Sequence, residues 1–116
     1  MSVMEGTPPS SPPARTVSRR TLLRQVRAYA QAPAQAIIAV EGLIAIIVSD
    51  EKVKEPELRL MLHLFAQVHE QSAPDLTLAN ACWRAAQAME KRLQGCSHGL
   101  QQDYSNFRSR NLLQTT

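Results

Sequence analysis

The chain has 116 residues and 12.9 kDa, which is room for one small domain and excludes a second independent hydrophobic core. Hydrophobic residues make up 44% of the sequence, too many for a wholly disordered chain, and two cysteines are too few for a disulfide-stapled mini-protein. The net charge of +3 is small for a nucleic-acid-binding module, and no apolar run reaches the ~20 residues of a membrane-spanning helix.

Residues 1–15 are rich in proline and small polar residues. Such a composition buries too little apolar surface to order itself, so it predicts a disordered tail. A polyproline-type docking segment is the alternative. We expect one helical domain to follow over residues 16–113.

Residues 17–31 predict the first helix. Leu22, Leu23 and Val26 share one face at helical spacing. Thr16 or Ser18 is expected to cap its start, and we expect the helix to end ahead of Pro33.

A second face of this helix is basic. Its arginines are Arg20, Arg24 and Arg27, with Arg19 beside them. Such a row usually forms a solvated face, but it could also contact phosphates, a membrane surface or acidic helices of a partner. We predict these four residues as possible contacts to phosphate or to an acidic partner.

Residues 18–24 resemble the short core motif of a twin-arginine export signal, and the acid-poor first 31 residues resemble a mitochondrial presequence. Export signals continue directly into an apolar stretch, whereas Gln25 and Arg27 follow the motif here. We therefore predict a cytoplasmic protein.

Residues 34–49 form the most apolar stretch, in which Glu41 is the only charge. Apolar residues surround the helical projection on all sides, so such a helix must lie at the centre of the domain or at an interface. A β-hairpin over 36–48 with a turn at Glu41-Gly42 is the alternative. Glu41 itself is expected either to be perturbed by burial or to be exposed or paired with an arginine, for example one of the first helix.

Three further helices are predicted, at 56–70, 73–94 and 99–113. Ser72 and Asp75 have the spacing of a capping box for the helix at 73–94. The predicted fold is therefore all-α, a bundle of four to five helices behind the N-terminal tail.

Metal-binding and catalytic patterns are weak in this sequence. The candidate ligands are His63, His69, Cys82, Cys96 and His98. They lack the paired spacing of zinc sites, and neither a nucleophile with a base nor a glycine-rich phosphate loop is present. We predict no catalytic residue, no metal and no cofactor.

The surplus of apolar surface is the most informative feature. The helices at 34–49 and 56–70 present more of it than the other helices can cover, and large exposed apolar patches mark interaction sites. We therefore predict a non-enzymatic protein-interaction module, a small regulator, adaptor or chaperone-like subunit that binds a protein partner or itself. The expected interface residues are Ile37, Ile44, Ile47, Leu60 and Leu64. An accessory nucleic-acid-binding protein and a peripheral membrane protein are the alternatives.

Overall fold

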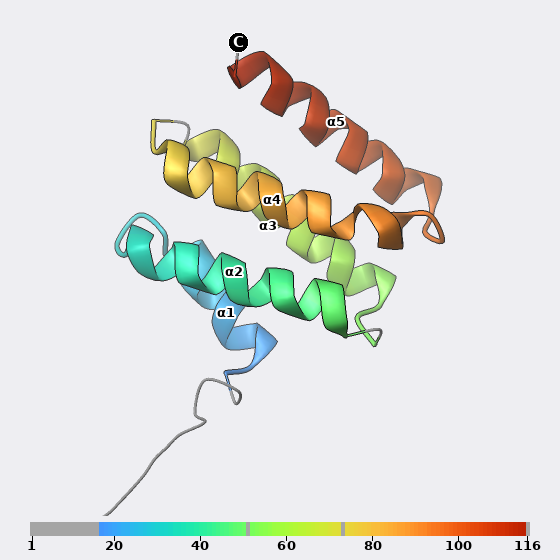
Figure 1. The fold of residues 1–116 in the computed structure, drawn as a ribbon, viewed down its shortest axis with the longest axis horizontal. Coiled ribbons are helices and arrows are strands. Elements are labelled where there is room, and N and C mark those ends of the chain that lie inside the picture. The colour runs from blue at the N-terminus through green and yellow to red at the C-terminus, as the bar shows by residue number, and fades with distance from the viewer. Residues whose placement is uncertain (1–16, 51, 73, 116) are drawn as a thin grey trace, which may run out of the picture.

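The computed structural model describes residues 17–50, 52–72 and 74–115, and these residues form five α-helices and no strand (Figure 1). The helices are α1 (Arg19–Arg27), α2 (Pro33–Ser49), α3 (Glu55–Gln71), α4 (Leu76–Leu93) and α5 (His98–Thr115). The all-α prediction is confirmed, and the stretch 36–48 is helical and not a hairpin. The predicted tail at 1–15 lies outside the described residues.

The first helix is shorter than the predicted span 17–31, since it begins at Arg19 and ends at Arg27, while the predicted cap at Ser18 is confirmed. The hydroxyl oxygen of Ser18 accepts a hydrogen bond of 3.1 Å from the backbone N–H of Thr21, as expected of an N-cap. The helix ends at Arg27, and a turn then leads to Pro33. Pro33 starts α2 because a proline at the first helical position loses no hydrogen bond.

The capping box predicted at Ser72 and Asp75 is not formed. The Ser72 hydroxyl donates a hydrogen bond of 2.6 Å to the backbone carbonyl of Val68, at the end of α3. Asp75 caps α4 alone, since its carboxylate accepts a hydrogen bond of 3.2 Å from the N–H of Leu78. The fourth helix therefore starts at Leu76 and not at 73.

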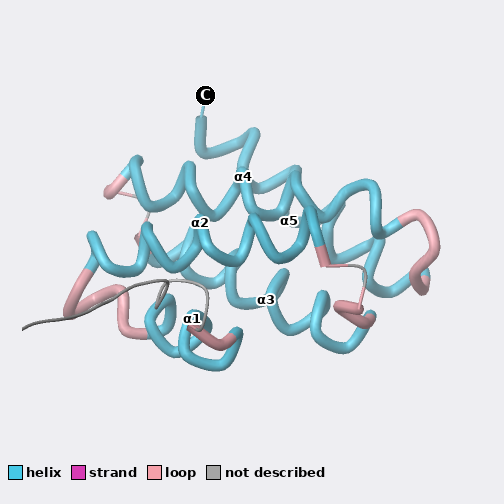
Figure 2. Tube along the Cα trace, turned by 60° about the horizontal axis from the view of Figure 1, so that its bottom comes forward, coloured by secondary structure: helices cyan, strands magenta, loops and turns pink. Residues whose placement is uncertain are grey.

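The most apolar helix lies at the edge of the bundle and not at its centre. Figure 1 shows α2 and α4 side by side, with α1 and α3 behind them and α5 along the far side of α4, and Figure 2 gives the same arrangement from another side. Among the described helices, α4 packs against α2, α3 and α5, whereas α2 packs mainly against α1 and α4. One side of α2 is therefore left without a neighbouring helix.

Buried side chains from all five helices form one mainly aliphatic cluster that includes Val26, Leu43 and Met89. Aromatic contacts attach α5 to this cluster. Trp83 of α4 stacks on Tyr104, with ring centroids 6.0 Å apart, and meets the ring of Phe107 edge-on at 5.4 Å. Such pairs contribute about 0.5–1.5 kcal/mol beyond the burial of their area.

Candidate functional site

The outward side of α2 is apolar and exposed to solvent. We call this surface the α2 face. Its exposed residues, at spacings of three and four along the helix, are Ala34, Ile38, Glu41, Ala45 and Val48. Ile38 is 62% exposed and Val48 70% exposed, which are high fractions for large hydrophobic side chains.

A groove runs beside the α2 face, between α1 and α2. Leu22 of α1 and Ile38 of α2 line it, together with Val17 just before α1. Gly42 also lines the groove, and a Cβ atom at this position would lie 3.3 Å from both δ-carbons of Leu22. The missing side chain therefore lets the two helices approach closely and continues the apolar surface from α2 toward α1.

The structure distributes the five predicted interface residues over three environments. Ile47 and Leu64 are buried inside the chain, at 0% and 6% exposure, so the bundle itself already covers them. Ile37 and Ile44 are half-buried and pack against the core. Leu60, on α3, is 44% exposed.

The most exposed apolar residues of α2, Ile38 and Val48, are missing from that prediction. A projection that is apolar all round does not show which side faces outward. The one available signal is Glu41, because a lone charge marks the solvent side of a helix. Ile38 lies three residues before Glu41, and Val48 lies seven residues after it, on the same side.

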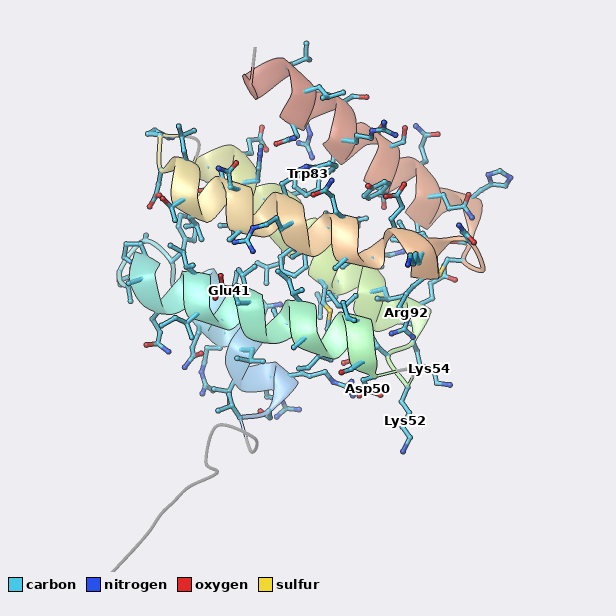
Figure 3. The ribbon with its side chains drawn as sticks, in the orientation of Figure 1. Glu41, Asp50, Lys52, Lys54, Trp83 and Arg92 are labelled. Carbon is cyan, nitrogen blue, oxygen red and sulfur yellow. The ribbon has the colours of Figure 1, made fainter. Side chains whose placement is uncertain are left out.

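Glu41 is exposed and pairs with an arginine. Its Oε2 lies 3.5 Å from Nη2 of Arg84, and Figure 3 shows Glu41 on the side of α2 that faces α4. Of the two expectations for this residue, the paired and exposed one is confirmed, although the arginine comes from α4 and not from the first helix. An exposed ion pair of this kind contributes about 0–1 kcal/mol to the stability of the fold, so it adds little to the packing of α2 on α4.

Arg19 forms ion pairs within the bundle. Its guanidinium lies 3.1 Å from Oδ2 of Asp50 and 3.0 Å from Oε2 of Glu57. It thereby ties the start of α1 to the end of α2 and to the first turn of α3. These two carboxylates occupy it, which removes it from the residues free to contact a partner.

The other three predicted arginines remain available. The side chains of Arg20, Arg24 and Arg27 are exposed, and none has a hydrogen bond or ion pair within 17–50, 52–72 and 74–115. Arg20 and Arg27 line a hollow between α1 and α3 together with Leu60. The structure thus joins residues that the sequence analysis assigned to two separate surfaces.

Two of the candidate metal ligands, His63 and His69, pair with side chains of α5. His63 Nε2 lies 2.7 Å from Oδ2 of Asp103, and the buried His69 Nε2 lies 2.8 Å from Oδ1 of Asn111. Both pairs join α3 to α5. Within the described part of the chain, no three His, Cys, Asp or Glu residues gather closely enough to hold a metal ion.

Both cysteines are free thiols with little thiolate character. Burial raises the pKa of the Cys82 thiol to about 12. The pKa of the half-buried Cys96 is also raised, first by burial and then by the carboxylate of Glu55. Neither thiol is activated as a nucleophile.

Comparison with known proteins does not place the chain in a family. Neither protein-family models, nor curated proteins, nor solved structures match it. Across the helices that the structure describes, none combines the length and apolar character needed to cross a bilayer. The described residues offer two candidate interaction surfaces, the α2 face and the hollow between α1 and α3.

Proposed function

We propose that this chain is a non-enzymatic protein-interaction module that pairs with a second copy of itself through the α2 face. The observation that carries the proposal is the outward side of α2, where Ile38, Ala45 and Val48 are exposed and Glu41 is the only charge. Water is a poor environment for such a surface, and an apolar partner helix would cover it.

The α2 face is complementary to itself. In an antiparallel pair with a two-fold axis between Glu41 and Gly42, Ile38 of one copy lies opposite Ala45 of the other, because both are equally far from the axis. A large side chain then meets a small one at both ends of the contact. The short side chain of Ala45 leaves room for Ile38 of the other copy, which favours dense packing.

The charges of the face also suit a two-fold pair. Each copy would bring one Glu41 and one Arg84 close to the axis. Two carboxylates and two guanidiniums can alternate around the axis. Each Glu41 then still pairs with an Arg84 guanidinium when the interface excludes water.

Packing would supply most of the association energy. Burying ~600 Å² of apolar area at ~25 cal/mol per Å² contributes on the order of 15 kcal/mol, before about 4–15 kcal/mol is subtracted for lost freedom on association. Exposed ion pairs contribute about 0–1 kcal/mol each. The affinity of the pair should therefore depend weakly on salt.

Two further parts of the proposal follow the chemistry of the described residues. The absence of an activated thiol and of a clustered metal-ligand set among them fits a regulator or adaptor better than an enzyme. Free thiols at Cys82 and Cys96 suit a reducing compartment such as the cytoplasm.

Light scattering after size-exclusion chromatography tests the proposal. The full chain should elute at about 26 kDa, twice its mass of 12.9 kDa, and Ile38→Asp should convert it to the monomer. Leu76→Asp is the matched control, because Leu76 is 69% exposed but lies at the start of α4, outside the α2 face. A monomeric wild-type chain at about 100 μM would overturn the proposal.

A further inference from the structure

We propose that the hollow between α1 and α3 binds an acidic, amphipathic helical segment of a partner protein. The hollow has a volume of about 510 Å³ and shares no lining residue with the α2 face. The residues that line it are Ser18, Arg19, Arg20, Leu23, Arg27, Glu57 and Leu60. The inference therefore goes beyond self-association and concerns a second, independent surface.

The positive charge of the hollow is not compensated inside the described chain. The carboxylate of Glu57 lies 3.0 Å from the guanidinium of Arg19, so the acid and the base on this wall satisfy each other. Arg20 and Arg27 have no such partner among residues 17–50, 52–72 and 74–115. Carboxylates of a ligand would pair with these two guanidiniums, which bind planar anions in a bidentate manner.

The hollow is also apolar between its charges. Leu23 lies on α1 between Arg20 and Arg27, and Leu60 stands 44% exposed on the α3 side. Leu60 thus offers an apolar contact beside two arginines that have no partner among the described residues. The hollow therefore suits a ligand segment in which an apolar side chain stands between acidic side chains.

The spacing of these residues fits a helix. Arg20, Leu23 and Arg27 follow one another at three and four residues, so the two guanidinium-bearing positions are separated by about 10.5 Å along the axis of α1. A partner helix with carboxylates seven residues apart and leucine between them repeats this pattern. It would lie along α1 with its leucine between Leu23 and Leu60.

The lining favours a peptide over a nucleic acid. None of the residues that line the hollow is aromatic, so bases would find no stacking platform. The whole chain carries a net charge of only +3, which is small for a surface that follows a continuous phosphate backbone.

Fluorescence anisotropy with a designed peptide tests the inference. The probe is a labelled 15-residue helical peptide with glutamates seven residues apart and leucines between them. Arg27→Gln should weaken its binding about fivefold, whereas Arg24→Gln should change it less than about twofold. The two variants lose the same charge from the same helix, but Arg24 does not line the hollow.

Two further variants test whether Leu60 contributes an apolar contact and whether peptide binding is independent of the dimer. Leu60→Ser should weaken binding of this peptide, and it should not change binding of a peptide whose leucines are replaced by serine. Ile38→Asp should leave the affinity unchanged, because the α2 face lies outside the hollow. Failure of the dimer and failure of this inference are therefore distinguishable.

Three results would overturn the inference. Equal losses for Arg24→Gln and Arg27→Gln would show unspecific attraction between charges. Tighter binding of a 15-nucleotide oligo(dT) than of the peptide would assign the surface to nucleic acid. If the peptide shows no saturable binding up to about 1 mM, the hollow does not bind the proposed class of ligand.

Discussion

The guanidinium of Arg92 donates a hydrogen bond of 2.6 Å to the backbone carbonyl of Asp50, the residue that follows α2. The same side chain donates to the carbonyl of Ile47 at 3.2 Å and to that of Val53 at 2.9 Å. Figure 3 shows Arg92 on α4, directed at the end of α2. One side chain thus donates to carbonyls at a helix end and in the following loop, and the carbonyl of Asp50 also accepts a backbone hydrogen bond of 3.3 Å from the N–H of Val53.

Replacing Arg92 should destabilise the bundle. Arg92→Met keeps most of the aliphatic stem but removes the hydrogen bonds to the carbonyls of Ile47, Asp50 and Val53, so the free energy of unfolding should fall by about 2–3 kcal/mol in urea titrations. Lys91→Met, on the exposed neighbouring residue, should change it by less than about 0.5 kcal/mol. Equal stabilities of the two variants would show that the contacts of Arg92 add nothing.

The buried pair of His69 and Asn111 should hold α5 in place. Asn111→Ala leaves the His69 ring buried without its acceptor, which should cost about 1–3 kcal/mol. Amide hydrogen exchange should then accelerate mainly in α5, which packs mainly against α3 and α4 among the described helices. Asn106→Ala is the control, since Asn106 is exposed and, within the described part of the chain, its side chain accepts a hydrogen bond from Gln102 of the same helix and from no other helix. Unchanged protection of α5 in Asn111→Ala would contradict this assignment.

Stability should fall in alkali because of Cys82. An unfolded chain ionises this thiol above about pH 9, whereas burial raises its pKa to about 12 in the folded chain. The folded state holds its proton more tightly, so its stabilising effect is complete below about pH 9 and is lost as pH rises toward 12. Cys82→Ala should lose stability less steeply over this range in urea titrations. Parallel curves for the two proteins would show that the Cys82 thiol is not responsible.

Local patterns in the sequence predict the helices, and long-range contacts decide the rest. Ser18 and Asp75 are short-range caps, whereas Arg92 reaches carbonyls about forty residues away in the sequence, a contact that no periodicity reveals. The pairing of His69 with Asn111 is equally distant.

The candidate site was predicted only in part for the same reason. Apolar periodicity identifies 34–49 as a helix that needs cover, but the orientation of α2 depends on how α1 and α4 pack against it. Ile47 therefore faces the core, and Ile38 faces solvent. Arg20 and Leu60 lie forty residues apart, and only the packing of α1 on α3 brings them to one hollow.

The register of the proposed pair is tested most directly by mixing two oppositely charged variants. One carries Ile38→Asp with Ala45→Asp, and the other carries Ile38→Lys with Ala45→Lys. Like charges meet across the two-fold axis in each variant alone, whereas opposite charges meet when the two are mixed. In sedimentation velocity, each variant should run as a monomer, and the equimolar mixture should run at about 26 kDa, twice 12.9 kDa. A mixture that stays monomeric while the wild-type chain dimerises would contradict pairing through the α2 face.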